Sequence, residues 1–181
     1  MDRVWLLTWT TYGTWLPGDP RGFVSNFAGA DGKGRRQNAP GSLPEADHPG
    51  LVAGARATLA EPAVWLTLAQ AREVLKQFRE TAGHRGWTLV AAAVMANHVH
   101  LVVGADGDPE PDLFLRDFKS YGSRRLSRAF GAAAGTTWWT QGGSNRILPD
   151  GAAVEAAVAY VERQANPLAV WSMNCPGEFP T

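Results

Sequence analysis

The sequence predicts an α+β fold in which helices pack on an antiparallel sheet. Segments with the composition of strands alternate with segments that carry apolar stripes at helical spacing, in the order strand, helix, strand, strand, helix, strand, helix. The two consecutive strands are separated only by a tight turn near Met95-Ala96, which favours an antiparallel hairpin. A length of 181 residues is enough for one domain with a proper core.

The first half of the chain contains one strand, a long irregular segment and one helix. Residues 3–11 are rich in Trp, Leu, Val and Thr, as is typical of a strand. Residues 17–50 are rich in Gly and Pro, and we expect an insertion at about 17–66. A helix is expected to begin at Thr67, which has the spacing of a capping box with Gln70, and to stop at Gly83. Its apolar stripe consists of Leu68, Ala71, Val74, Leu75 and Phe78.

The second half contains the expected hairpin and two further helices. Strands are expected over 86–94 and 97–103, followed by a helix over about 110–130. Residues 136–148 are expected to form a short strand pair around Gly142-Gly143. A last helix is expected from about Ala152 to Ala165, because Pro167 disfavours a helical conformation at the residue before it.

Composition argues against several classes of protein. The 17 Lys and Arg residues balance 17 Asp and Glu residues, which disfavours a strongly basic nucleic-acid binder but permits a local basic patch. The single cysteine, Cys175, excludes an internal disulfide and fits a reducing cytoplasm. The first residues lack the pattern of a signal peptide, and no segment approaches the roughly 18 apolar residues of a membrane span. We therefore expect a cytoplasmic protein that does not contact a membrane.

Two histidines stand at alternate positions of the second hairpin strand. Because alternate side chains of a strand point to the same face, His98 and His100 would project side by side, with Val99 pointing into a core. Two imidazoles held in this way can supply two ligands of a metal site, and a third ligand must then come from elsewhere. The alternative is a solvated strand face that carries two histidines without a function.

The last expected helix offers a third ligand and a nucleophile. Tyr160 and Gln164 are four residues apart, so they would lie on one helix face. The amide oxygen of Gln164 is a reasonable ligand for a hard divalent ion. A metal of this kind polarises a phosphate oxygen, and the Tyr160 hydroxyl could then attack the phosphorus. The alternative is that Tyr160 is a half-buried packing residue and Gln164 a surface amide.

Two segments together resemble a known family. They are Met95-Ala96-Asn97-His98-Val99-His100-Leu101-Val102-Val103 and Tyr160-Val161-Glu162-Arg163-Gln164-Ala165-Asn166-Pro167. They resemble the single-tyrosine HUH transposases, with a closer likeness to the REP-associated tyrosine transposase branch. The resemblance covers the first strand and about residues 67–168. It implies one ferredoxin-like HUH endonuclease domain over residues 1–181, with the Gly- and Pro-rich insertion at about 17–66.

The resemblance also implies an activity and a site. His98, His100 and Gln164 match the ligands of Mg²⁺ or Mn²⁺, and Tyr160 matches the nucleophile. The implied reaction is endonuclease cleavage and strand transfer of single-stranded DNA beside a hairpin, through a 5′-phosphotyrosine. Members of the family include homodimers that exchange the tyrosine helix and monomers that do not, so the oligomeric state stays open.

A basic helix face offers candidate DNA contacts and a rival nucleophile. The candidate contacts are Lys119, Arg124, Arg125 and Arg128, together with Arg146, and the alternative is a solvated helix face. Tyr121 lies on the same helix, but Arg125, four residues later, cannot ligate a metal, so we favour Tyr160. Aromatic residues that could either stack on unpaired bases or fill the core are Trp9, Tyr12, Trp15, Trp138 and Trp139.

Two other functions compete with the nuclease. One is a domesticated, non-catalytic protein that binds single-stranded or hairpin DNA. The other is an unrelated histidine phosphohydrolase acting on small nucleotides. Such enzymes commonly need a further histidine on the same strand face, and the next position on that face is Val102. We therefore rank the phosphohydrolase last.

Overall fold

A computed structural model of the chain describes residues 1–20, 26–28, 34–36, 49–132 and 136–174. The chain divides into two compact units, one formed by Met1–Tyr12 with Val64–Thr181 and the other by Gly13–Ala63. The expected insertion at about 17–66 overlaps the second unit almost completely. Cys175 lies outside the described residues.

The unit Gly13–Ala63 has regular elements that the sequence analysis did not predict. They are the antiparallel strands β2 (Asn26–Ala28) and β3 (Gly34–Arg36) and the helix α1 (Pro49–Ala57). Each strand has only three residues, and α1 begins with a proline and a glycine and contains no buried residue. Such short or weakly patterned segments give no clear periodic signal.

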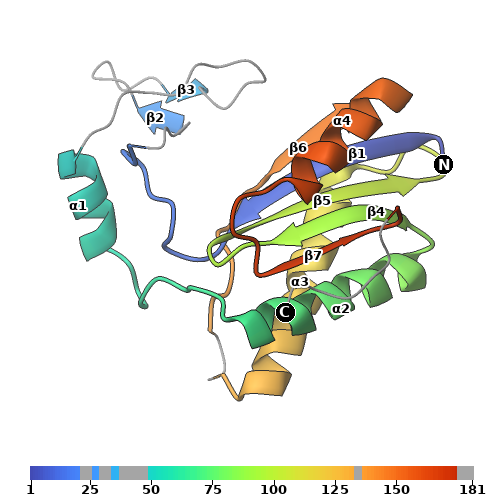
Figure 1. Cartoon of the computed structure of the whole chain (residues 1–181). Coiled ribbons are helices and arrows are strands. Elements are labelled where there is room, and N and C mark those ends of the chain that lie inside the picture. Colours follow the sequence, from blue (N-terminus) through green and yellow to red (C-terminus); the bar gives the residue numbers. More distant parts are fainter. Residues whose placement is uncertain (21–25, 29–33, 37–48, 133–135, 175–181) are drawn as a thin grey trace. The chain divides into compact units, whose positions relative to one another are not determined.

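The larger unit is a five-stranded antiparallel sheet with helices on both faces, which confirms the α+β class (Figure 1). In spatial order the strands are β6 (Ser144–Leu148), β1 (Arg3–Thr10), β5 (His98–Ala105), β4 (Thr88–Val94) and β7 (Ala169–Ser172). Helices α2 (Leu68–Arg85) and α3 (Pro111–Phe130) cover one face, and α4 (Gly151–Glu162) covers the other. No helix in the described part of the chain has the length and apolar character that crossing a membrane requires.

The strands divide their side chains between two cores. On β1, Trp5, Leu7 and Trp9 face α2 and α3, where Trp9 packs edge-on against Phe78 at 5.5 Å between ring centroids. The alternate residue Val4 contributes to the smaller core beneath α4. This alternation follows from the period of two along a strand, so each strand presents a separate set of side chains to α4.

The boundaries of α2 follow its caps. Its start is confirmed, because Gln70 N donates to Thr67 Oγ1 at 3.3 Å and Thr67 N donates to Gln70 Oε1 at 2.8 Å. The expected stop at Gly83 is wrong, since the helix continues to Arg85. It ends where Gly86 adopts a left-handed φ of 69°, a conformation that glycine takes without steric cost.

The C-terminal third differs from the sequence prediction in three ways. Residues 136–148 do not form a strand pair of their own, because β6 pairs with β1 while Trp139 makes an isolated bridge to Thr11. Helix α4 ends at Glu162, not Ala165, so Gln164 lies beyond its C-terminal cap. The following strand β7, which pairs with β4, was not predicted because four residues are too few to show alternation.

The core beneath α2 and α3 gives a test of the packing. We expect Phe78→Ala to lower the free energy of unfolding by about 3–5 kcal/mol, because the ring is fully buried between Trp9 and Phe118. Urea unfolding followed by circular dichroism measures this loss. The control Leu68→Ala lies on the same helix but is 39% exposed, and it should change stability by much less. Equal losses in the two variants would contradict the packing described.

Candidate functional site

The histidine pair lies on the sheet face that α4 covers. Val99, Leu101 and Val103 of β5 belong to the opposite core, so His98 and His100 project toward α4, as the alternation predicts. Their ring centroids are 4.9 Å apart. The two imidazoles are therefore close enough to act on one small ligand.

Hydrogen bonds orient both imidazole rings. Nδ1 of His98 lies 2.7 Å from Asn97 Oδ1, and Nδ1 of His100 lies 2.8 Å from Thr8 Oγ1. A carbonyl oxygen only accepts, so Nδ1 of His98 is the donor and the lone pair of that ring is on Nε2. In the tautomer in which His100 donates to Thr8, its lone pair is also on Nε2. Both rings then carry their lone pair on Nε2, and a hydrogen bond at the other ring nitrogen is typical of metal-bound histidines.

Burial keeps His100 neutral. The residue is 5% exposed, and burial, with a smaller contribution from the charge of His98, lowers the pKa of His100 from 6.5 to about 4. Because a neutral imidazole is the form that binds metal, His100 is ready to act as a ligand at neutral pH.

Helix α4 brings Tyr160 against the histidines. The centroid of the Tyr160 ring lies 5.1 Å from that of His100, with the rings nearly perpendicular at 77°. Tyr160 is nonetheless 50% exposed, so a large substrate can reach it. The helix is fixed at its start by Asp150, whose side chain accepts from Ala153 N at 2.8 Å, and at its end by Glu162, which accepts from Ser172 of β7 at 2.6 Å.

Gln164 lies just beyond α4 and contacts the same turn of the chain as Tyr160. Its Nε2 donates to the backbone oxygen of Tyr160 at 3.0 Å, which leaves the amide oxygen as the atom available to a cation. Among the described residues, no group of three His, Cys, Asp or Glu side chains could hold a metal. A metal site built on His98 and His100 therefore needs another kind of donor, and the Gln164 amide is one. Because such donors are uncharged, they would not offset the positive charge with which a divalent cation polarises a phosphate oxygen.

The basic residues predicted on α3 lie on the helix that covers the opposite face of the sheet from the histidines. Lys119 donates to the backbone oxygens of Thr140, Gln141 and Gly142, and burial lowers the pKa of Lys119 to about 8. Its three protons are thus committed to the segment that leads into β6. We infer a structural role for Lys119 where the sequence suggested a phosphate contact.

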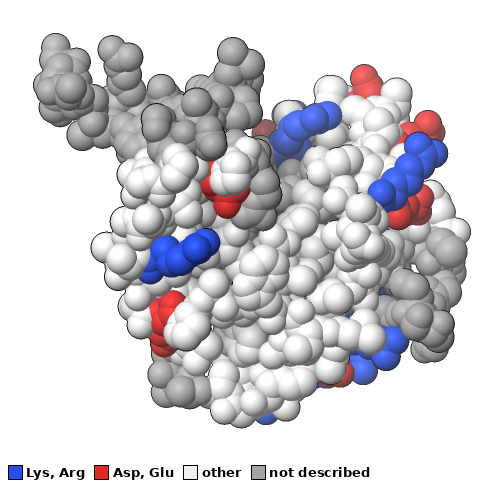
Figure 2. Space-filling view, turned by 60° about the vertical axis from the view of Figure 1, so that its left-hand side comes forward, with Lys and Arg blue, Asp and Glu red and all other residues white. Residues whose placement is uncertain are grey.

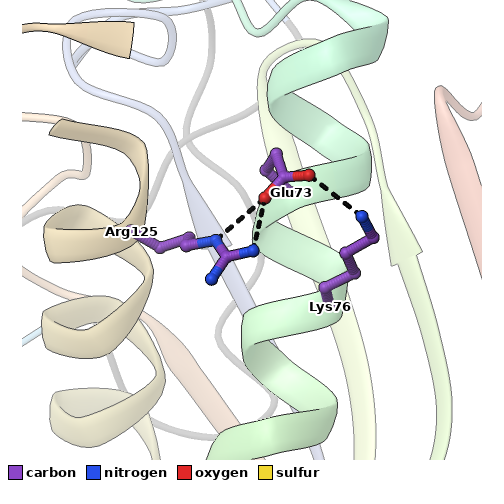
Figure 3. Close-up of polar contacts among 3 residues, drawn as sticks. All are labelled: Glu73, Lys76 and Arg125. Atoms are coloured by element: carbon purple, nitrogen blue, oxygen red, sulfur yellow. Dashed lines mark hydrogen bonds and ion pairs between the residues drawn. The ribbon is translucent and has the colours of Figure 1, made fainter. Parts of the chain in front are cut away.

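Arg125 is likewise committed to another side chain. Its Nε and Nη2 both donate to Glu73 Oε2, at 2.8 and 2.7 Å, and Glu73 also accepts from Lys76 at 3.1 Å (Figure 3). These bonds lower the pKa of Glu73. The arrangement joins α3 to α2 across 52 residues of sequence, which local pattern could not reveal.

The remaining cations of the predicted patch are divided between two places. Arg124 lies over the Tyr121 ring at 4.3 Å, and Arg128 is exposed near the end of α3. Arg146 alone of the predicted set is on β6, at the edge of the sheet beside α4. On the face shown in Figure 2, basic and acidic side chains are scattered over a largely uncharged surface.

The rival nucleophile Tyr121 and most of the aromatic residues considered for base stacking lie away from the histidine pair. Tyr121 lies on α3, beneath Arg124 and near Arg85, whose guanidinium carbon is 5.9 Å from its ring centroid. Trp9, Trp138 and Trp139 are buried in the core beneath α2 and α3, so they are not stacking surfaces for bases. Trp15 is 36% exposed, and Tyr12 is partly buried.

A groove of about 390 Å³ opens next to Tyr160. Strands β1 and β6 contribute Leu6, Thr8, Ser144 and Arg146, and α4 contributes Ala156, Ala157 and Tyr160. The sequence analysis did not identify Thr8, Ser144 or Asn97 as site residues. Asn97 directly precedes His98 and could have been noticed, but only strand pairing reveals Thr8 and Ser144.

The low pKa of His100 makes the stability of the metal-free protein depend on pH. The His100 imidazole takes up a proton near pH 6.5 in the unfolded chain but only near pH 4 in the folded chain. The contribution of neutral His100 to the free energy of unfolding is therefore complete above pH 6.5, and it is lost as the pH falls toward 4. We expect urea unfolding in EDTA to show a loss of at most roughly 3 kcal/mol over this interval.

Matched variants test whether the pH dependence comes from His100. His100→Gln should show a shallower fall in stability with decreasing pH than the original protein. His84→Gln, at the exposed end of α2, should behave as the original protein does. Identical pH dependence in His100→Gln and the original protein would show that His100 is not buried in its neutral form.

Comparisons with known proteins agree with the motifs. The family described as "Transposase IS200 like" matches residues 63–164, a segment that contains both histidines, Tyr160 and Gln164. No curated protein matches the chain in sequence.

Two solved structures are similar at low identity. A REP-associated tyrosine transposase bound to a REP hairpin shares 12% identity at a TM-score of 0.47, and the match covers 88% of this chain but 64% of that one. A proposed transposase from Deinococcus radiodurans shares 20% identity at a TM-score of 0.44, and the match covers 92% of this chain and 94% of that one. The family match extends over more than half of the residues and confirms the expectation from the two motifs. The chain belongs to the IS200-like transposases.

Proposed function

We propose that this transposase is a metal-dependent endonuclease and strand transferase that acts on single-stranded DNA through Tyr160. The observation that supports this most directly is the position of the Tyr160 ring, 5.1 Å from His100 and half exposed. Here the phenol is accessible and lies beside two oriented imidazoles, as a nucleophile at a metal site must.

His98, His100 and Gln164 would hold the cation, which we propose to be Mg²⁺ or Mn²⁺. When bound, the cation supplies Lewis acidity at a phosphate oxygen. Thr8 and Asn97 fix the two rings, and Gln164 is tied to the backbone of Tyr160. The ligands and the nucleophile thus keep their relative positions before substrate arrives, which reduces the cost of orientation.

The covalent step is an exchange of one phosphate ester for another. The Tyr160 oxygen forms a bond to phosphorus and loses its proton to solvent, while the bond between phosphorus and the 3′ oxygen breaks. The products are a 5′-phosphotyrosine and a strand with a free 3′ hydroxyl. Because the ester is retained, a 3′ hydroxyl can attack it and rejoin the strand.

We propose that one chain forms the complete site, without exchange of the tyrosine helix between subunits. Only Pro149 and Asp150 separate β6 from α4, and β7, which begins at Ala169, pairs with β4 of the same sheet. Connections this short at both ends of α4 leave little chain with which to reach a partner. The DNA substrate is proposed to be single-stranded with an adjacent hairpin, as the resemblance to the single-tyrosine HUH transposases implies.

The nucleophile is tested by covalent capture. With Mn²⁺ and a pool of hairpin oligonucleotides with randomised single-stranded flanks, we expect a protein–DNA adduct on denaturing gels. A label at the 3′ end of the DNA should stay with the protein, because the linkage is a 5′ phosphate, and a label at the 5′ end should be released. Tyr160→Phe should abolish the adduct, and the control Tyr121→Phe should retain it.

The outcomes separate the competing functions. An adduct that persists in Tyr160→Phe would refute the assigned nucleophile. Hairpin binding by the original protein without any metal-dependent cleavage would favour a non-catalytic DNA-binding role.

The metal site is tested through a residue that supports it. We expect Thr8→Val to weaken Mn²⁺ binding by about 10–100-fold in calorimetric titration, because it removes the partner of His100 Nδ1 while preserving shape. The control Thr10→Val lies two residues along the same strand, where the hydroxyl bonds to Thr140 at 3.0 Å. Similar Mn²⁺ affinity in both variants would argue against His100 as a ligand.

A further inference from the structure

The groove next to Tyr160 is built from two paired rows of side chains and one helix wall. Ser144 pairs with Thr8, and Thr8 pairs in turn with His100, so these three side chains form a polar row across the sheet. Arg146 pairs with Leu6 in the adjacent row. The groove therefore continues directly from the proposed metal ligands toward the edge strand β6.

Small residues on α4 keep the groove open. Ala156 and Ala157 form its helix wall together with Tyr160, and Leu6 lies opposite on β1. A volume of about 390 Å³ lies at the lower end of the roughly 300–1,000 Å³ of small-molecule sites. Its largely apolar lining carries three hydroxyl groups, those of Thr8, Ser144 and Tyr160, and one cation. Such a lining suits a flat ring that carries polar edges and a nearby negative charge.

Arg146 is the cation of the predicted patch that lines the groove, and it differs from Lys119 and Arg125 in having no partner to give up among the residues that the structure describes. Lys119 is committed to backbone oxygens and Arg125 to Glu73. Arg146 is exposed, and it makes no ion pair with a residue in the described ranges. Its guanidinium can therefore bind a phosphate at the groove without breaking an existing contact.

We infer that this groove binds one unpaired nucleotide of the DNA strand, next to the phosphate that Tyr160 attacks. This inference rests on the proposed function, whose phosphate lies at the Tyr160 end of the groove. The base packs against Leu6 and the alanines of α4, its edges face the hydroxyls of Thr8 and Ser144, and Arg146 contacts the phosphate. A base within a duplex is stacked and paired, so the groove selects single-stranded DNA.

The test measures binding without cleavage. Full-length protein carrying Tyr160→Phe keeps the ring but lacks the hydroxyl, and it is titrated in EDTA with each of the four deoxynucleoside 5′-monophosphates and with 2-deoxyribose 5-phosphate. Two-dimensional NMR of the backbone amides reports the site. We expect shifts centred on Ser144, Arg146, Ala156 and Ala157, and at least about fivefold tighter binding of the nucleotides than of the sugar phosphate, because only the nucleotides bury a base.

Two variants in the same background separate the base from the phosphate. Arg146→Ala should weaken every phosphate ligand by about tenfold, whereas Arg128→Ala, an exposed cation on α3, should not. Ala156→Phe should fill the groove and remove the preference for nucleotides over the sugar phosphate. Ala152→Phe is the matched control, since Ala152 is exposed one helical turn earlier and does not line the groove.

Failure of this inference is distinct from failure of the nuclease. Equal affinity for nucleotides and 2-deoxyribose 5-phosphate, or shifts centred on α3, would overturn the groove assignment even if Tyr160 forms an adduct. Groove binding that loses its base preference in Ala156→Phe would support the assignment even if no adduct forms.

Discussion

Close packing of α4 on the sheet is the constraint on which the site depends. Beneath the helix, β4 presents the fully buried Ala91 and Ala93, whose side chains are single methyl groups. Val158 and Val161 fill this interface, and Tyr160, the residue before Val161, is carried to the edge that faces His100. Larger side chains on β4 would push the helix outward and separate the phenol from the imidazoles.

The proposed binding of DNA is compatible with a chain of no net charge, because the cations differ in whether they are hydrogen-bonded to other residues. On α3, Lys119 is bonded to backbone oxygens and Arg125 to Glu73, so both contribute to the connections between helices and loops. Arg146 stands apart, at the edge strand beside the candidate site. Attraction to DNA would therefore be concentrated near the reacting phosphate, where it helps orientation more than general affinity.

The helix start at Thr67 and the common face of the two histidines could be predicted, because residues close together in sequence determine both. The capping box of Thr67 and Gln70 uses neighbouring residues, and the common face of His98 and His100 follows from strand geometry. The proximity of Tyr160 to His100 is a long-range contact, which the sequence alone could suggest only through family resemblance. Its position in the structure agrees with that suggestion.

The sequence analysis missed contacts and a groove that residues distant in sequence form, and it misplaced the end of α4. Lys119 and Arg125 look like solvated cations until the segment 140–142 and Glu73 are placed beside them. The groove was missed because β1, which supplies part of its lining, is separated by more than a hundred residues of sequence from β6 and α4, which supply the rest. The end of α4 was placed too late because Pro167 limits a helix but does not require it to continue that far.

A crystal structure of the protein grown with Mn²⁺ would be the most direct measurement, because anomalous scattering locates the ion independently of the protein atoms. We expect one ion about 2.0–2.4 Å from Nε2 of His98 and His100 and from the amide oxygen of Gln164. The Tyr160 hydroxyl beside it should belong to the same chain. An ion bound elsewhere, or a Tyr160 that points away from the imidazoles of its own chain, would contradict the arrangement described.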